Sequence, residues 1–549
     1  MKAAETFVRT LRAAGVDTFF GLPGSTEAPL LEALRAEGGI RYVLALHEAA
    51  AVGMADGYAR ASGRAGLVGL HTTVGCMNGM SAVFNAYRDG TPVVVTAGHK
   101  DRKVLTDDGF SAYPNLANLF HGFTKSAWQS MTADSVSADL ARAIQRAMLP
   151  PAGPTFLGVP EDLMAAEVAE AEPGWPRVEQ LGSSNQPDSQ LLDAVVERLR
   201  SAEQAVMVVG TGAAGASAEL AGLAAALEIP LLAADLTDLA TLESPPQSHY
   251  LGVYGEQAEV LQGSDLVLAI GSRMFYPFSD ANRPQLPAGA QLIHLHADAA
   301  EIGRVTPTAI GLAGDPRAIT RSLLTRLKAG GALEATIRER RQKRVAGLRE
   351  LRCQALESER KASWDAQPIS VTRAAVEIGR ALPDNAIVVE EGVRASKLLF
   401  RHGTVPRGGA IWRSSGGALG WGLPAAVGAK LARPDRPVAL LVGDGTFHFT
   451  VQALWTAVKQ KAPVTIVILD NGGYLAVKRA VENYLKVPMD PRSHPGTDIG
   501  GIDHLEVARG YGAEGVRIDN ASEIGEALRS GLSSGRVQVI VVPVAPLRP

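Results

Sequence analysis

Two short polar segments in the last quarter of the chain carry side chains that suit a metal-bound diphosphate. Residues 443–446 read Gly-Asp-Gly-Thr, and residues 470–474 read Asp-Asn-Gly-Gly-Tyr. Asp444 and Asn471 offer a carboxylate and an amide oxygen, the hard donors that Mg²⁺ prefers. The glycines let backbone groups approach a phosphate closely. Each segment alone is typical of an ordinary turn, so the prediction depends on the two lying together.

The pattern between the two segments predicts a strand, a helix and a second strand. Apolar runs at 438–442 and 464–469 have the length of buried strands. Thr450 is the expected N-cap of the helix. The apolar residues after it fall on one helix face: Val451, Leu454, Trp455 and Val458. Parallel strands end at one edge of an α/β sheet, where ligands usually bind, so the two segments should be neighbours. Thr446 would lie near a helix start, whose free N–H groups attract anions.

Three further polar side chains follow strand-like runs in the first part of the chain. They are Ser25, Glu48 and His71. Apolar strands alternate with helices up to about residue 160, which indicates a parallel sheet covered on both faces. The three groups should therefore share one edge of that sheet. Two plainer interpretations stay open: Glu48 as a first-turn acid favoured by the helix dipole, and His71 as a hydrogen-bonded residue at a strand end.

Length and composition describe a large globular chain. The 549 residues suggest about three domains, and 46% hydrophobic with 20% charged residues predicts packed cores. A net charge of -3 argues against nucleic acid or an anionic membrane as partner. The start shows no secretory signal, and no apolar run approaches the roughly 20 residues that span a bilayer. Cys76 and Cys353 suggest neither a disulfide framework nor a metal site, so we expect a cytoplasmic protein.

The predicted fold class is α/β, with three doubly wound parallel-sheet domains. Their expected bounds are residues 1–178, 190–330 and 365–549. A polar stretch around 179–189 is the expected linker between the first two. Residues 334–362 are charged and helical in composition, and they predict a solvated connecting helix.

The central domain carries a glycine pattern found in dinucleotide-binding folds. A strand-like run leads into Gly210, Gly212 and Gly215, and Asp235 follows another strand. This spacing matches the Gly-x-Gly-x-x-Gly fingerprint. Glycines at these positions also serve for close helix-to-strand packing alone, so the pattern leaves nucleotide binding open.

Motifs along the whole chain form a recognisable set. They are residues 21–27 (Gly-Leu-Pro-Gly-Ser-Thr-Glu), 44–49 (Leu-Ala-Leu-His-Glu-Ala), 55–59 (Ala-Asp-Gly-Tyr-Ala), 70–71 (Leu-His), Asn78, 423–426 (Leu-Pro-Ala-Ala) and the stretch from 443. The set resembles the thiamine diphosphate enzymes of the pyruvate decarboxylase and acetohydroxyacid synthase superfamily, and within it the benzoylformate decarboxylase group. Asp470 stands where that family has Asn, whereas Asn471 is kept.

The resemblance implies thiamine diphosphate and Mg²⁺ as cofactors. It makes the first domain pyrimidine-binding, the central one Rossmann-like and the third diphosphate-binding. The implied metal ligands are Asp444, Asn471 and the backbone oxygen of Gly473. The implied cofactor-binding residues are Gly417, Leu419, Gly445, Thr446, Tyr474 and Asn78.

Catalytic roles also follow from the resemblance. Glu48 would lie against the aminopyrimidine and promote loss of the C2 proton of the cofactor. Gly417 would accept the 4′-amino group through its carbonyl oxygen, and Leu419 would keep the cofactor bent. Ser25 and His71 match substrate-facing residues, for carboxylate recognition and proton transfer. The site would lie between the subunits of a homodimer or homotetramer.

The expected reaction is decarboxylation of an aromatic or branched 2-oxo acid to an aldehyde and CO₂. Phe278 stands where benzoylformate decarboxylase has a second active-site His, so a carboligase or lyase with the same cofactor is a rival. The sequence also leaves open a dinucleotide-dependent oxidoreductase that uses residues 210–215, and a catalytically silent relative.

Overall fold

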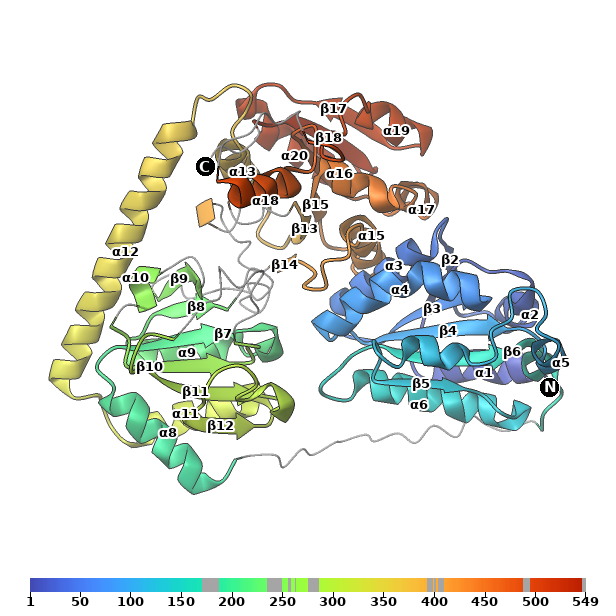
Figure 1. Ribbon diagram of the computed structural model, residues 1–549, viewed down its shortest axis with the longest axis horizontal. Helices are drawn as coiled ribbons and strands as arrows, with labels where there is room; N and C mark the ends of the chain where they lie inside the picture. Colours follow the sequence, from blue (N-terminus) through green and yellow to red (C-terminus); the bar gives the residue numbers. More distant parts are fainter. Residues whose placement is uncertain are drawn as a thin grey trace.

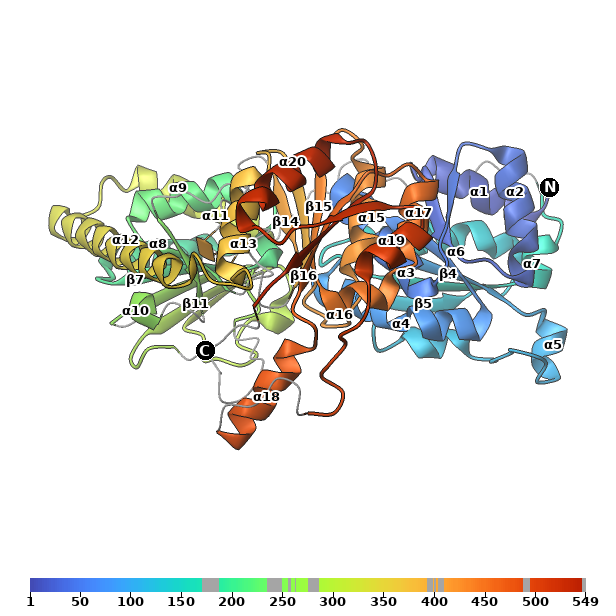
Figure 2. The same cartoon turned by 90° about the horizontal axis from the view of Figure 1, so that it is seen from above.

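Three α/β units make up the chain (Figures 1 and 2). The computed structural model describes residues 1–169, 187–234, 249–254, 258–261, 263–274, 286–392, 398, 401–402, 409–486 and 494–545. Each unit holds a six-stranded parallel sheet, which confirms the predicted fold class. Asp235, Phe278 and most of the expected linker lie outside the described residues. Within the described ranges, every helix is too short or too polar to cross a bilayer.

The N-terminal unit, blue to cyan in Figure 1, has the strand order β2-β1-β3-β4-β6-β5. Its strands are β1 (Thr18–Gly21), β2 (Arg41–Leu44), β3 (Gly66–His71), β4 (Val93–His99), β5 (Ser126–Gln129) and β6 (Thr155–Pro160). Its helices are α1 (Ala3–Ala13), α2 (Ala28–Glu37), α3 (Glu48–Ser62), α4 (Thr72–Asp89), α5 (Arg102–Thr106), α6 (Val136–Met148) and α7 (Glu161–Ala165). The central strands are buried along most of their length, whereas β2 at the edge has only one buried residue, Val43.

The central unit, green in Figure 1, has the order β12-β11-β10-β7-β8-β9. Its elements are α8 (Ser189–Ser201), β7 (Ala205–Val209), α9 (Ser217–Leu227), β8 (Leu231–Ala233), β9 (Tyr250–Val253), α10 (Ala258–Leu261), β10 (Leu266–Ile270), β11 (Gln291–His296), β12 (Ile310–Ala313) and α11 (Pro316–Ala329). A methyl group on Gly210 would lie 2.4 Å from the carbonyl oxygen of Gly271. Close packing is therefore reason enough for glycine at that position.

The C-terminal unit has the order β14-β13-β15-β16-β18-β17. This order matches that of the N-terminal unit, strand for strand. Its strands are β13 (Ile387–Glu391), β14 (Ala410–Trp412), β15 (Val438–Gly443), β16 (Thr465–Asp470), β17 (Glu514–Arg517) and β18 (Gln538–Pro543). Its helices are α13 (Val371–Ala381), α15 (Gly422–Ala432), α16 (Asp444–Phe447), α17 (Ala453–Lys459), α18 (Leu475–Leu485), α19 (His504–Gly510) and α20 (Ile524–Ser533). Figure 2 shows α18 projecting from the body.

A long helix, α12 (Ala335–Ser363), connects the central and C-terminal units, as predicted, and runs along one side of the molecule (Figure 1). It is not solvated throughout, because Arg341 is only 2% exposed. Its guanidinium donates to the carbonyl oxygens of Leu199 and Leu227, near the ends of α8 and α9. Burial lowers the pKa of Arg341 to about 10. The helix is therefore fixed to the central unit by a buried cation that bonds to helix-end carbonyls.

The sequence predicted one helix that begins after Thr450, and the predicted start is wrong. The chain forms the short α16, a 3₁₀ turn at His448–Thr450 and then α17. Thr450 does not cap α17, because its hydroxyl donates to the carbonyl oxygen of Gly420 at 2.6 Å. The Thr450 hydroxyl therefore bonds to a residue distant in sequence instead of capping the helix that follows it.

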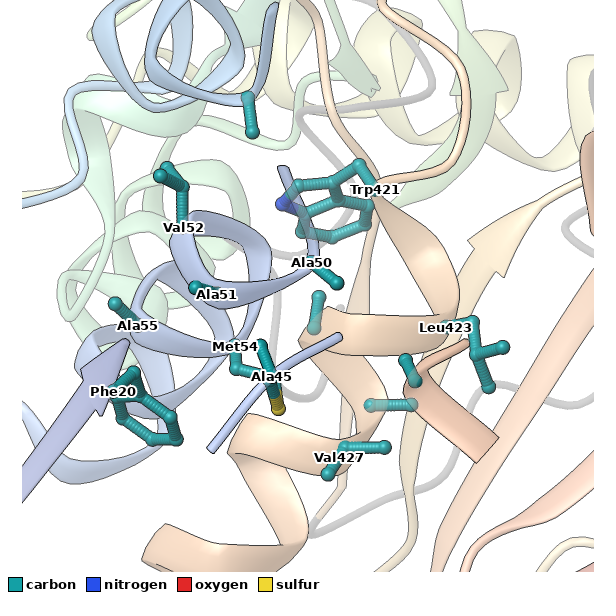
Figure 3. Packing of buried hydrophobic residues seen from close by; sticks show 14 of the residues in the cluster. Phe20, Ala45, Ala50, Ala51, Val52, Met54, Ala55, Trp421, Leu423 and Val427 are labelled. Carbon is teal, nitrogen blue, oxygen red and sulfur yellow. The ribbon is translucent and has the colours of Figure 1, made fainter. Parts of the chain in front are cut away.

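Helices α3 and α15 join the N-terminal and C-terminal units through a shared hydrophobic core. Figure 3 shows the two helices side by side, with Trp421 close to Ala50. A methyl group on Gly57 would lie 2.0 Å from the carbonyl oxygen of Ala425, and one on Gly428 would lie 2.0 Å from that of Met54. Glycine at these two positions lets the helix backbones touch.

We predict that Gly57→Ala destabilises the protein. The added methyl group has no space, and overpacking a core typically costs about 1–3 kcal/mol. Gly347→Ala is the matched control, because Gly347 is also helical but has no atom within 4 Å of an added methyl group. That variant should gain about 0.5–1 kcal/mol, the usual advantage of Ala over Gly in a helix. Midpoints of thermal unfolding measure both, and an unchanged midpoint for Gly57→Ala would contradict the helix contact.

Candidate active site

The two polar segments of the C-terminal unit lie side by side at one sheet edge. Strands β15 and β16 are paired in parallel, with Gly443 opposite Leu469, so the predicted adjacency is confirmed. Asp444 begins α16 and is 2% exposed. Its carboxylate accepts the N–H of Gly445 at 2.9 Å and the N–H of Gly473 at 3.0 Å. Asp444 thus bridges the ends of both strands.

The buried carboxylate of Asp444 suits a bound cation. Burial raises the pKa of Asp444, and the charge of Asp470 adds to the rise. In the described part of the chain, no basic side chain forms an ion pair with Asp444. A buried carboxylate is costly without a positive partner, and the paired strand end after Asp470 adds the amide oxygen of Asn471 and backbone carbonyl oxygens to the sequence of this edge. This donor set suits Mg²⁺.

The glycines and the aromatic residue of this edge pack directly on one another. A methyl group on Gly445 would lie 2.5 Å from the ring of Tyr474, and one on Gly473 would lie 2.2 Å from the carbonyl oxygen of Thr497. Thr446 is nearly buried in the first turn of α16. The segment therefore presents backbone groups rather than bulky side chains at the end of the sheet.

Glu48 is the first residue of α3, at the end of the loop after β2. The carboxylate is largely buried and accepts a hydrogen bond from the side chain of Asn78 at 3.2 Å. A methyl group on Gly75 would lie 3.3 Å from the same carboxylate. No ion pair to Glu48 occurs among the described residues. The helix dipole favours an acid at this position, and the carboxylate still has oxygen lone pairs to offer a ligand.

His71 ends β3 and is held by a residue that the sequence analysis did not single out. Its Nδ1 lies 2.9 Å from a carboxylate oxygen of Glu27 and 3.1 Å from the hydroxyl of Thr26. Glu27 is 6% exposed, and a methyl group on Gly98 would lie 2.0 Å from its other oxygen. Glu27 was visible as the last residue of the motif at 21–27. Ser25 directly precedes Thr26 and Glu27 in the chain, and its side chain is exposed.

The hydrogen bonds around His71 determine which ring nitrogen carries the proton. The hydroxyl of Thr26 donates to Glu27 at 2.9 Å, so its oxygen is left to accept. The carboxylate of Glu27 also accepts. Nδ1 of His71 must therefore donate, and Nε2 is left free to exchange a proton.

The loop between β14 and α15 holds Gly417 and Leu419. Gly417 has a φ of 80°, in the left-handed region that favours glycine, and no atom lies within 4 Å of a methyl group placed on it. Leu419 leaves 37% of its surface exposed. This loop therefore presents the accessible backbone of Gly417 and the exposed side chain of Leu419, two residues apart.

Within one chain the predicted residues form two separate groups. Ser25, Glu48 and His71 belong to the N-terminal unit, and the groups around Asp444 and Gly417 belong to the C-terminal unit. In the part of the chain that the structure describes, no hydrogen bond or ion pair joins the catalytic candidates to the metal-ligand candidates. Helix α4 carries exposed apolar side chains close to Asn78, with Val74 at 57% and Met77 at 62% exposure.

Comparison with protein families identifies three consecutive matches. Residues 1–119 match the thiamine pyrophosphate enzyme N-terminal TPP binding domain, residues 192–323 the central domain, and residues 397–542 the C-terminal TPP binding domain. The matches follow the order of the three units.

Individual proteins resemble the chain over nearly its whole length. A benzoylformate decarboxylase of Pseudomonas aeruginosa is 33% identical over 98% of both chains. A probable acetolactate synthase large subunit of Methanocaldococcus jannaschii is 28% identical over 100% of this chain and 92% of its own. A 4-hydroxybenzoylformate decarboxylase structure from Rhodococcus jostii has a TM-score of 0.84 and 29% identity, covering 99% of each chain.

We predict that His71 carries its proton on Nδ1 in the neutral state. Long-range ¹H–¹⁵N NMR of histidine-labelled protein distinguishes the two ring nitrogens, and a His71→Ala variant assigns the signals. His99 serves as internal control, because its Nε2 lies 3.0 Å from the carbonyl oxygen of Tyr113 and must donate. Glu27→Ala should let His71 exchange between both forms. A His71 ring with its proton on Nε2 would contradict the geometry.

Proposed function

The chain belongs to the thiamine pyrophosphate enzyme family, and on this premise we propose that it decarboxylates an aromatic or branched 2-oxo acid to an aldehyde and CO₂. The observation that carries the proposal is the fixed ring of His71. Nδ1 is held by Glu27 at 2.9 Å, and Nε2 has no hydrogen bond in the described part of the chain. A general acid–base residue needs this arrangement. Full-length similarity to a benzoylformate decarboxylase supports the reaction class.

The cofactors in this proposal are thiamine diphosphate and Mg²⁺. When bound, thiamine diphosphate supplies an electron sink for the pair left by departing CO₂. The metal ligands would be Asp444, Asn471 and the carbonyl oxygen of Gly473. The residues that would contact the organic cofactor are Gly417, Leu419, Gly445, Thr446, Tyr474 and Asn78. The buried carboxylate of Asp444 without a basic partner among the described residues supports the metal assignment.

Each catalytic candidate has one task. Glu48 would hydrogen-bond to the aminopyrimidine of the bound cofactor and favour its reactive protonation state, with Asn78 holding the carboxylate. His71 exchanges a proton with the carbonyl oxygen of the substrate through Nε2. Ser25 is exposed and precedes Thr26 and Glu27, which hold His71. It binds the substrate carboxylate.

The proposed active site forms between two subunits of a homodimer or homotetramer. Glu48 of one chain would face Gly417, Leu419 and Asp444 of the other. In the described part of one chain, no hydrogen bond or ion pair joins the two groups, which supports this arrangement, as do the exposed apolar side chains of α4 beside Asn78. A two-fold axis would complete both sites at once. The cytoplasmic location predicted from the sequence is part of the same proposal.

Carboligation is the second candidate function. It is favoured by Phe278, which stands where benzoylformate decarboxylase has a second active-site His and lies outside the described residues. The similarity to an acetolactate synthase supports the same interpretation. Product analysis separates the two reactions.

We expect the purified protein to release CO₂ and the matching aldehyde in equal amounts from at least one 2-oxo acid. The panel is benzoylformate, a branched 2-oxo acid and pyruvate, each with thiamine diphosphate and Mg²⁺. A chelator should abolish turnover and added Mg²⁺ should restore it, because the donor set requires a hard cation. A 2-hydroxy ketone in place of the aldehyde would establish carboligation, and no cofactor binding would establish a silent relative.

Replacing Glu48 and His71 should cause different failures. Glu48→Gln should slow exchange of the cofactor C2 proton and stop turnover of every substrate, because Glu48 acts before substrate binds. His71→Ala should leave that exchange near normal and lower kcat by about 10²- to 10⁴-fold, the usual worth of acid–base help. The exposed His121 provides the control variant His121→Ala, which should match wild type. Normal C2 exchange in Glu48→Gln, or normal kcat in His71→Ala, would refute the corresponding role.

A further inference from the structure

Asn85, one turn before the end of α4, is hydrogen-bonded to the loop that carries Gly417 and Leu419. Its side-chain amide donates to the carbonyl oxygen of Ala418 at 2.8 Å and accepts the N–H of the same residue at 3.1 Å. Asn85 is 1% exposed. A primary amide paired with both polar atoms of one peptide residue fixes the loop in position and in rotation.

The residues before Gly417 are also fixed to α4. A methyl group on Gly416 would lie 2.2 Å from the side-chain oxygen of Asn85 and 2.7 Å from its Cα, so the loop backbone rests directly on the helix. One turn further along α4, a carboxylate oxygen of Asp89 accepts the N–H of Ser415 at 2.8 Å. Helix α4 therefore holds the loop on both sides of Gly417.

Gly417 itself has no side chain to set its direction, and among the described residues no atom lies within 4 Å of a methyl group placed on it. Its φ of 80° with open space around it means that its peptide orientation comes from Gly416 and Ala418. Beyond Leu419, the next contact is Thr450 with the carbonyl oxygen of Gly420. Asn85 is the side chain whose hydrogen bonds lie between Gly417 and Leu419.

We propose that Asn85 is a positioning residue that aims the carbonyl oxygen of Gly417 and the side chain of Leu419 at the cofactor. The inference rests on the proposed function, in which these two groups contact the aminopyrimidine. Asn85 acts on the loop of its own chain, whereas Glu48 of that chain serves the other site of the dimer. Helix α4 thus supplies Asn78 to one active site and Asn85 to the other.

The single variant Asn85→Ala tests the positioning role. It should keep the fold and the oligomeric state, bind thiamine diphosphate more weakly in fluorescence titrations and slow C2 proton exchange. We expect at least about a tenfold loss in exchange rate, since misplacing reacting groups by 1 Å can cost about 10²-fold. Val83→Ala is the control, because Val83 is fully buried on the same helix and has no polar side-chain atom that could hydrogen-bond to the loop. Equal losses in both variants would overturn the proposal.

Asn85→Asp covers the case in which Asn85→Ala does not fold. It keeps the shape of the side chain and replaces only the donor to the carbonyl oxygen of Ala418 by an acceptor. The same two measurements apply. Wild-type cofactor affinity together with a wild-type exchange rate in this variant would refute the positioning role.

Hybrid dimers test which active site Asn85 serves. Two differently tagged chains, one with Glu48→Gln and one with Asn85→Ala, are co-expressed and the hybrid is purified through both tags. One site then combines both defects, and the other is intact if Asn85 acts on its own chain's loop. The hybrid should therefore show about half of the wild-type exchange rate per dimer. A rate at half that of the Asn85→Ala homodimer would mean that Asn85 acts on Glu48 of its own chain, which overturns the proposal.

A second hybrid separates failure of this inference from failure of the proposed function. It pairs Glu48→Gln with Asp444→Ala and depends only on the site lying between subunits. Recovery in this hybrid without recovery in the Asn85 hybrid refutes the role of Asn85 alone. No recovery in either refutes the arrangement between subunits, and the inference falls with it.

Discussion

The contact between the backbones of α3 and α15 is the constraint on which the rest of the structure depends. Gly57 and Gly428 have no side chain to separate the helices, and each would collide with a carbonyl oxygen 2.0 Å from an added methyl group. Because the two units meet so closely, they share one hydrophobic core and cannot shift without losing it. This contact also places α4 beside the loop that leads into α15.

Charged side chains also lie at this contact between the N-terminal and C-terminal units. Arg60 pairs with Asp56 at 2.5 Å and with Asp89 at 2.6 Å, and its guanidinium lies 4.7 Å from the centre of the Trp421 ring. Buried ions need partners in good geometry, since an unpaired one is strongly destabilising. Asp89 also accepts from Ser415. The network therefore couples the packing of the units to the loop that holds Gly417.

In contrast to the paired charges around Arg60, two carboxylates of the candidate site have no cationic partner among the described residues. Glu48 and Asp444 are buried carboxylates without ion pairs among the described residues, and each is held by neutral N–H donors. Such groups are less stable than paired ones in the absence of ligand. A cation at Asp444 and an aminopyrimidine at Glu48 would supply the missing partners. Ligand binding at these two carboxylates would then stabilise the folded protein.

The sequence determined the features that depend on neighbours along the chain. Strand and helix periods predicted three parallel-sheet units, and strand-end glycines marked Asp444 and Asn471 as neighbours. Only the tertiary structure revealed Glu27 beside His71, 44 positions away, and Asn85 beside Ala418, 333 positions away. The misplaced cap at Thr450 has the same cause, because its hydroxyl bonds to Gly420 rather than to the next turn. A polar side chain forms a hydrogen bond with a group that the packed units bring within about 3 Å. That group can be far away in the sequence, so the residues next to the side chain do not predict it.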